Sequence, residues 1–203
     1  MPDQQSLGGG SGVMEMQEIE IKLAVGEVGR LRSDLSSLGF RVAVPRFHEL
    51  NLVFDTRDKD LARRRCLLRL RRGGGRNVLT AKAPSAPGRD HPGYKVRRET
   101  EVLVSDFDAT RLILENSGFE VVFTYEKFRE ILEGRGVHVM LDETPAGNFI
   151  EIEGEPSAID RLALDMGFRK EDYITANYRT LFLAGGGTGD MLFPQSRHES
   201  GKG

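Results

Sequence analysis

The 203-residue chain contains no tryptophan and only one cysteine, Cys66. A lone cysteine excludes an intramolecular disulfide and cannot by itself form a cysteine-based metal site. No apolar run approaches the roughly 20 residues that a membrane-spanning helix needs. The N-terminus also lacks the basic region and apolar segment of a signal peptide, so we expect a cytoplasmic protein that does not enter a membrane.

The sequence also has no marked excess of either charge, because 30% of its residues are charged but the formal net charge is only −2. Proteins that bind the phosphate backbone of nucleic acids usually carry a basic excess, so no nucleic-acid partner is expected. A chain of this length suits one domain with a substantial core. We expect a monomer or a homodimer, between which the sequence does not decide.

Three parts of the chain differ in composition. Residues 1–15 are rich in glycine and polar residues, and we predict that they form a disordered leader. Residues 16–184 are predicted to form the folded domain. Residues 185–203 are predicted to form a flexible C-terminal tail, in which only the apolar stretch 191–193 could dock on the domain.

Three segments of the domain, 28–38, 107–117 and 157–166, are predicted to be helical. Each has apolar residues at helical spacing, and each is followed by Gly-Phe. Glycine just past a helix supplies the left-handed cap, and the phenylalanine after it can pack back on the last turn. A fourth helix is expected at 174–183, on a weaker pattern.

Strand-like segments separated by turn residues account for most of the remaining domain. They are 17–23, one strand within 40–54, 66–72, 77–83, 94–104, 120–133, 137–142 and 149–153. Their connections are mostly short, so neighbouring strands should be antiparallel. Because a sheet of eight antiparallel strands tends to close, the predicted fold is α+β, a closed eight-stranded antiparallel β-barrel with helices packed outside.

The first of these strands has one charged and one apolar face. Glu18, Glu20 and Lys22 alternate with three apolar residues, and side chains along a strand switch faces at every residue. Any one such strand could be a surface strand with a wet face. Several strands repeat the pattern, however, with paired charges where a solvent-facing strand normally carries Thr, Ser, Gln or Tyr.

If the barrel closes with its apolar faces outward under the helices, the charged faces line the bore. Enclosed charges are costly unless each is paired or meets a ligand, so the pattern indicates function. Clustered Arg and Lys suit a chain of phosphates, and paired carboxylates suit Mg²⁺ or Mn²⁺. The sequence therefore predicts a triphosphate site.

The segment Glu18-x-Glu20-x-Lys22 resembles the signature of the CYTH superfamily, the triphosphate tunnel metalloenzymes. The likeness continues, in the family's order, through further segments that include Leu68-Arg69-Leu70-Arg71, Lys95-Val-Arg97-Arg-Glu99-Thr-Glu101, Glu126-Lys127-Phe-Arg129 and Asn148-Phe-Ile-Glu151-Ile-Glu153. The resemblance implies an eight-stranded tunnel and a divalent-metal-dependent reaction at a triphosphate.

The resemblance also implies roles for individual residues. The implied metal ligands, for Mg²⁺ or Mn²⁺, are Glu18, Glu20, Asp142, Glu151 and Glu153. The implied phosphate-binding residues are Lys22, Arg69, Arg71, Lys82, Lys127 and Arg129. The implied catalytic group is Glu99 and Glu101, which would position a second metal or the attacking water, with Lys95 and Arg97 on the same strand. Many relatives carry a lysine on the C-terminal helix, which this chain lacks, and Tyr178 or Arg179 is the candidate replacement.

The implied substrate is a small-molecule triphosphate, namely inorganic triphosphate, thiamine triphosphate or ATP. We favour hydrolysis, because it makes the simpler chemical demand. The alternative is a class IV adenylyl cyclase that converts ATP to cyclic AMP and pyrophosphate. A third reading is a polyphosphate- or nucleotide-binding module without turnover, against which the carboxylate pairs argue.

Overall fold

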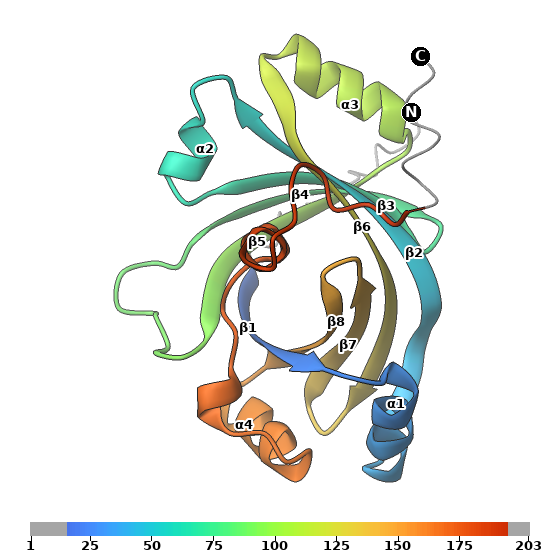
Figure 1. The fold of residues 1–203 in the computed structure, drawn as a ribbon. Helices are drawn as coiled ribbons and strands as arrows, with labels where there is room; N and C mark the ends of the chain where they lie inside the picture. The colour runs from blue at the N-terminus through green and yellow to red at the C-terminus, as the bar shows by residue number, and fades with distance from the viewer. Residues whose placement is uncertain (1–15, 195–203) are drawn as a thin grey trace, which may run out of the picture.

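Eight antiparallel strands form a closed barrel in the computed structural model, which describes residues 16–194 (Figure 1). The strand order around the barrel is β1-β5-β4-β3-β2-β6-β7-β8. β1 (Met16–Val25) closes it by pairing with both β5 (Lys95–Val104) and β8 (Gly147–Gly154). The predicted α+β class and closed barrel are confirmed, whereas the predicted leader, 1–15, lies outside the described residues.

The other five strands are also where the sequence predicts them, with ends shifted by a few residues. They are β2 (Arg41–Thr56), β3 (Leu67–Gly73), β4 (Arg76–Pro84), β6 (Phe119–Gly134) and β7 (Val137–Thr144). β3 and β4 are joined by Gly74 and Gly75, which have φ of 58° and 73°. Two successive positive φ values give the tight turn whose twist matches the flanking strands, and glycine adopts them without strain.

The four predicted helices are α1 (Val28–Ser37), α3 (Phe107–Asn116), α4 (Pro156–Asp165) and α5 (Tyr178–Ala184). The Gly-Phe endings behave as predicted: Gly39, Gly118 and Gly167 have φ of 89°, 89° and 85°. After α1, the amide of Phe40 returns to the carbonyl of Leu35 at 3.0 Å, which satisfies an acceptor at the helix end. None of the described helices is long and apolar enough to cross a membrane.

A one-turn helix, α2 (Asp60–Arg63), is not predicted from the sequence. The carboxylate of Asp55, at the end of β2, accepts hydrogen bonds from the amides of Leu61 at 2.9 Å and Ala62 at 3.0 Å. This long-range cap supplies the partners that the first amides of a helix lack. A short 3₁₀ turn, η1 (Lys170–Asp172), follows α4.

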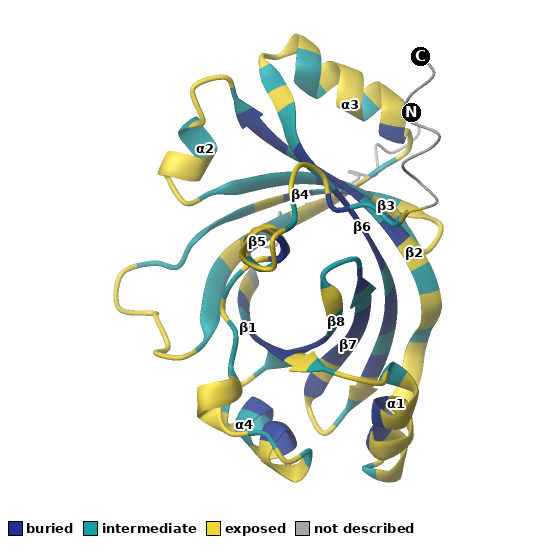
Figure 2. Cartoon of the chain, viewed as in Figure 1, coloured by how far each residue is buried: buried dark blue, intermediate teal, exposed yellow. Residues whose placement is uncertain are grey.

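The main hydrophobic core lies outside the barrel, between its apolar outer face and the helices α1 and α4 (Figure 2). β1, β7 and β8 contribute fully buried residues such as Ile21, Val139 and Ile152, which pack in one cluster with Leu35 of α1 and Ile159 of α4. Because strand side chains alternate between faces, burial of the apolar residues on the outside directs the charged residues into the bore.

The segment after α5 returns to the barrel, where the apolar stretch that could dock, 191–193, supplies Met191. Met191 is fully buried and pairs with β6, since its amide donates to the carbonyl of Thr124 and its carbonyl accepts from the amide of Glu126, each at 3.0 Å. β7 pairs with β6 only from Phe128 onward, so this stretch of edge is available. Residues 195–203 lie outside the described part.

The stretch just before α5 is also attached to the barrel, at β1. The amide of Ile174 donates to the carbonyl of Lys22 at 2.8 Å, and the amide of Lys22 donates back at 3.1 Å. β5 has ended its pairing with β1 at Glu20, so Ile174 satisfies the edge that β5 leaves. Along the chain, α5 lies between these two attachments and is the red coil seen end-on in Figure 1.

The position of the core gives a test of the fold. Leu35→Ala, which removes a fully buried side chain from α1, should lower the free energy of unfolding by about 2–5 kcal/mol through lost burial and a residual cavity. Leu112→Ala on α3, where the side chain is 58% exposed, should change it by less than about 0.5 kcal/mol. Urea unfolding of both variants measures the difference, and equal losses would contradict this core.

Candidate active site

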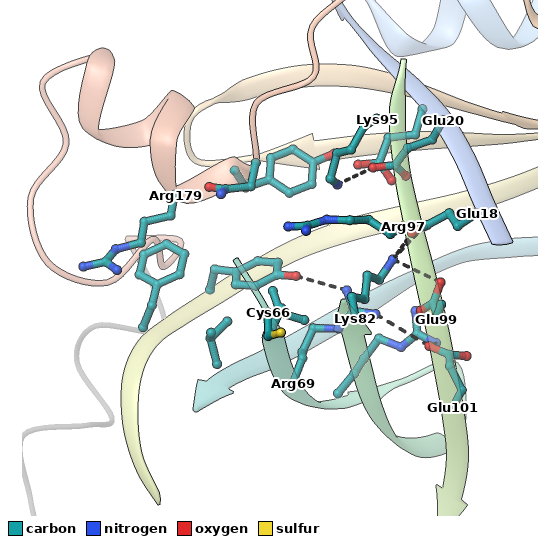
Figure 3. A pocket seen from close by; sticks show the side chains of 18 of the residues that line it. Glu18, Glu20, Cys66, Arg69, Lys82, Lys95, Arg97, Glu99, Glu101 and Arg179 are labelled. Atoms are coloured by element: carbon teal, nitrogen blue, oxygen red, sulfur yellow. Dashed lines mark hydrogen bonds and ion pairs between the residues drawn. The ribbon is translucent and has the colours of Figure 1, made fainter. Parts of the chain in front are cut away.

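The bore of the barrel is a cavity of about 1130 Å³ with charged walls (Figure 3). Every predicted site residue except Asp142 lines it: Glu18, Glu20, Lys22, Arg69, Arg71, Lys82, Lys95, Arg97, Glu99, Glu101, Lys127, Arg129, Glu151 and Glu153. These residues come from strands far apart in the sequence. Closure of the barrel therefore brings the predicted acidic and basic sets into one space.

The register of β1 places opposite charges side by side. Glu20 is directly opposite Lys95 on β5 and opposite Glu153 on β8, and Lys22 is opposite Glu151. Directly opposed residues of antiparallel neighbours point to the same face, with β-carbons about 5 Å apart. β1 is thus the strand at which the acidic residues of β8 meet the charged residues of β5.

Carboxylates crowd together on one wall of the cavity, and their pKa values diverge. Burial and the neighbouring carboxylates of Glu18 and Glu20 raise the pKa of Glu153 to about 7. Burial, with Glu18 and Glu101 nearby, raises the pKa of Glu99 to about 7. For Glu20, burial acts in the same direction but the Lys95 ammonium outweighs it, and its pKa falls to about 2.

Lysines hold the carboxylates of this wall (Figure 3). The ammonium of Lys82 donates to both carboxylate oxygens of Glu18, at 2.6 and 2.7 Å, and lies 3.1 Å from a carboxylate oxygen of Glu99. Lys95 donates to Glu20. Each lysine therefore offsets the desolvation of the carboxylates beside it.

A second group of charges lies deeper, around Lys22, Lys127 and Arg129. The Lys22 ammonium is 2.6 Å from Glu151, and Arg129 also contacts Glu151. Arg129 makes a two-pronged contact with Asp142, from Nε to Oδ1 at 2.7 Å and from Nη2 to Oδ2 at 2.6 Å. Lys127 donates to the same carboxylate at 3.0 Å.

Asp142 is fully buried and does not line the cavity, unlike the other predicted metal ligands. Its carboxylate accepts hydrogen bonds from Lys127, Arg129 and the hydroxyl of Tyr178. This position, behind the cations, does not fit the predicted contact with a metal. It favours a role in orienting Lys127 and Arg129 toward the bore.

Tyr178 and Arg179, the two candidates on α5, have different surroundings. The Tyr178 hydroxyl donates to Asp142 at 2.5 Å, and its ring centroid lies 4.5 Å from the Lys22 ammonium and 5.1 Å from that of Lys127. Burial and Asp142 raise the pKa of Tyr178 well above its usual range, so it stays a neutral donor. Arg179 lines the cavity and brings the positive charge.

Glu49 on β2 is a member of the charged network that the sequence reasoning missed. It is 1% exposed and lies 3.5 Å from Arg71 and 3.6 Å from Lys127. Burial opposes its ionisation, but Lys127 and Arg129 outweigh burial and lower its pKa to about 2. The available signal was its spacing of two residues from Asn51, which puts both on one face of the strand.

Within residues 16–194, no three His, Cys, Asp or Glu side chains are grouped as a formed metal site. The donor chemistry of the acidic wall nevertheless fits a hard divalent cation, because carboxylate oxygens are the ligands that Mg²⁺ and Mn²⁺ prefer. Burial, followed by repulsion from Glu18 and Glu20, raises the pKa of Glu153, and a bound cation would offset that repulsion. Glu18, Glu20 and Glu153 are thus the residues suited to hold one.

Comparisons with known proteins identify relatives of this chain. The CYTH domain family matches residues 16–170. A curated protein of Methanocaldococcus jannaschii, named "Putative adenylate cyclase", is 30% identical over 146 residues, which are 71% of this chain and 81% of that protein.

Two solved structures have the same fold. A "putative adenylate cyclase" from Vibrio parahaemolyticus superposes with a TM-score of 0.72 and 20% identity, over 84% of this chain and 99% of that one. A "putative adenylyl cyclase" from Hippeastrum, described as having a dominant triphosphatase activity, superposes with a TM-score of 0.62 and 22% identity, over 87% and 98%.

The position of Asp142 predicts a large loss of stability on neutralisation. Asp142→Asn leaves Lys127 and Arg129 buried without their shared carboxylate, so the free energy of unfolding should fall by about 3–5 kcal/mol. The matched variant Asp165→Asn breaks an exposed pair with Arg135, at 2.6 Å, and should cost less than about 1 kcal/mol. Urea unfolding compares them, and similar small losses would argue against a buried role for Asp142.

The raised pKa of Glu153 predicts a pH dependence of stability. The folded state favours the protonated carboxyl, so this contribution is fully present below the unfolded pKa of 4.5 and is lost as the pH rises through about 7. Between pH 5 and pH 8 without metal, the free energy of unfolding of the unmodified protein should therefore fall by on the order of 2 kcal/mol more than that of Glu153→Gln. Urea unfolding in a chelator at both pH values tests this, and parallel pH slopes would refute it.

Proposed function

The chain belongs to the CYTH domain family, and we propose that it is a divalent-metal-dependent phosphohydrolase that acts on inorganic triphosphate or on an organic triphosphate. CYTH proteins in general depend on metal ions, and the named relatives support an enzyme of this type. The observation that carries the proposal is the meeting of carboxylates and cations along β1, where Glu20 and Lys22 face Glu153 and Glu151 in one cavity.

The cations of the bore are suited to bind the phosphates. Arg69 and Arg71 on β3 line the same cavity as Lys127 and Arg129 on β6. A guanidinium offers paired N–H donors that match phosphate oxygens, and it keeps its charge at any physiological pH. Held in a confined space, these groups would orient the triphosphate and offset the charge that develops on the transferred phosphoryl group.

The acidic wall is suited to the chemical step. Glu18, Glu20 and Glu153 would hold Mg²⁺ or Mn²⁺, which when bound neutralises phosphate charge and makes water a better nucleophile. Glu99 would orient the attacking water and accept its proton, because a carboxylate with a pKa of about 7 is matched to general-base work near neutral pH. Glu101, which accepts from Thr80 at 2.7 Å and lies 3.7 Å from Arg69, would help to position Glu99.

A class IV adenylyl cyclase is the second candidate, favoured by the name of the Methanocaldococcus jannaschii relative. In that reaction the ribose 3′-hydroxyl of ATP attacks the α-phosphorus and pyrophosphate leaves. The triphosphatase activity described for the Hippeastrum protein, on the same fold, supports hydrolysis instead. A binding module without turnover is a weaker candidate, because polyanion binding alone gives no reason to bury several carboxylates.

Parallel assays separate the three candidates. Purified protein is incubated with Mg²⁺ or Mn²⁺ and with inorganic triphosphate, thiamine triphosphate or ATP, and inorganic phosphate and cyclic AMP are measured side by side. Phosphate release without cyclic AMP is the expected result. Cyclic AMP with pyrophosphate from ATP would assign the cyclase, and retention of every substrate unchanged would assign the binding module.

The metal assignment predicts the behaviour of a double variant. Glu18→Gln with Glu20→Gln should lower the metal-dependent turnover rate at least about a hundredfold, since a catalytic metal supplies several kcal/mol of charge stabilisation. Circular dichroism should show that the barrel survives. The control carries the same change at two exposed carboxylates, Glu133→Gln with Glu171→Gln, and should keep its turnover. Undiminished turnover in the Glu18–Glu20 variant would sink the assignment.

A further inference from the structure

A second cavity, of about 400 Å³, opens beside the turn between β3 and β4. Its walls are largely apolar and include Val44, Phe47, Val78, Leu103 and Ile131. Arg71, Glu101 and Val102 line both this cavity and the charged one, so the two are adjacent and share a wall. Its volume is within the range of small-molecule sites, roughly 300–1,000 Å³.

The cavity-lining faces of β4 and β5 change from charged to apolar along the strands. On β5 the charged residues from Lys95 to Glu101, seen along the strand in Figure 3, give way to Leu103 on the same face. On β4, Lys82 gives way to Val78, which is paired beside Leu103. From Arg97, which is opposite Glu18, to Leu103 the strand advances about 20 Å at roughly 3.3 Å per residue.

Unpartnered polar atoms lie near the junction of the two cavities. The side chain of Asn51 is completely buried, and neither its amide nitrogen nor its oxygen has a hydrogen-bond partner. It is directly opposite Arg71, on the same face of β2 as Glu49, whose Oε2 accepts no hydrogen bond but lies 3.6 Å from the Lys127 ammonium. Burying polar atoms without a hydrogen-bond partner is unfavourable, so this stretch of β2, behind Arg71, is incompletely satisfied in the protein alone.

We propose that the natural substrate is an organic triphosphate whose aromatic or otherwise apolar ring group occupies the second cavity. This inference rests on the proposed function. The ring group would pack against Phe47, Val78 and Leu103, and the phosphates would extend from Arg71 toward Glu18 and Glu20. Phe47 packs closely against the turn, since a β-carbon added at Gly73 or Gly74 would lie 3.2 or 3.5 Å from its ring.

This orientation determines which bond breaks. The phosphate next to the organic group lies by Arg71, and the terminal phosphate lies among the carboxylates. The oxygen of water bonds to the terminal phosphorus, the bond to the bridging oxygen breaks, and its electron pair stays on the organic diphosphate. Inorganic phosphate and one proton are the other products. Cyclisation would instead require the organic group and the first phosphate to lie among the carboxylates, at the opposite end.

The test compares substrates with and without an organic group. Leu103→Asp places a charge in the second cavity, and Leu103 is 67% exposed, so the fold should tolerate the change. The kcat/KM for ATP or for thiamine triphosphate, whichever the unmodified protein prefers, should fall at least about tenfold, a typical effect of losing an apolar contact. The value for inorganic triphosphate should stay within about twofold. Phe47→Ala should act in the same direction.

Leu164→Asp is the matched control, because Leu164 on α4 is 70% exposed and lies outside both cavities. It should leave kcat/KM unchanged for both types of substrate. If Leu103→Asp changes kcat/KM for the organic substrate no more than the control does, the inference is overturned while the proposed hydrolysis is left intact. The inference would also be overturned if the unmodified protein had the same kcat/KM for inorganic triphosphate as for both organic substrates. Release of pyrophosphate from ATP would overturn it as well.

Binding measurements separate failure of the inference from failure of the proposed function. Calorimetric titration of the unmodified protein and Leu103→Asp with ATP, thiamine triphosphate and inorganic triphosphate needs no turnover. If no substrate is hydrolysed, the proposed function fails, but selective weakening of the organic ligands by Leu103→Asp still supports the second cavity as their site. Unchanged affinity for all three ligands overturns it.

Discussion

Enclosure of charge inside the barrel is the constraint on which the rest of the structure depends. Removing a carboxylate or ammonium from water costs several kcal/mol, so each enclosed charge must lie next to an opposite one. Pairs such as Glu20 with Lys95 and Lys22 with Glu151 meet this requirement across neighbouring strands. Because charged residues occupy much of the bore, the main hydrophobic core forms on the outer face, where α1 and α4 cover it.

The same pairing connects stability with function. In the protein alone, Lys82 holds Glu18 and Glu99, and Asp142 holds Lys127 and Arg129 from behind. A ligand that brings phosphate oxygens and a divalent cation would offer new partners to both kinds of charge, so binding exchanges one set of ion pairs for another. The carboxylates at the junction of β1 and β8, where burial and mutual repulsion raise the pKa of Glu153, would gain most from that exchange.

Much of the fold could be predicted because its main signal is local. Alternation along β1 assigns each side chain to a face without any knowledge of its neighbours, and closure then brings these faces together. How deep a side chain lies within the bore cannot be predicted from the alternation along its own strand. For this reason Asp142 was predicted to contact a metal, although it lies behind Lys127. Glu49 was missed because it is the only charged residue on its face of this stretch: Asn51, two residues on, is neutral and Phe47, two residues before, is apolar. α2 depends on the cap that Asp55 supplies from the end of β2, and the docking of Met191 depends on the free edge of β6. Neither contact is indicated by the local sequence pattern.

The closing of the barrel by its first and last strands has a consequence for how the chain is made. Lys22 and Glu151 are 129 residues apart, so β1 cannot find β8 until most of the domain has left the ribosome. Pairings at such separation form slowly and late, and an unpaired strand edge is prone to aggregation in the meantime. On β1 that edge carries Glu18, Glu20 and Lys22, charges of the kind that discourage association between strands. The residues proposed to bind substrate would thus also keep the nascent chain hydrated, and they would give up their water only when the last strand closes the ring.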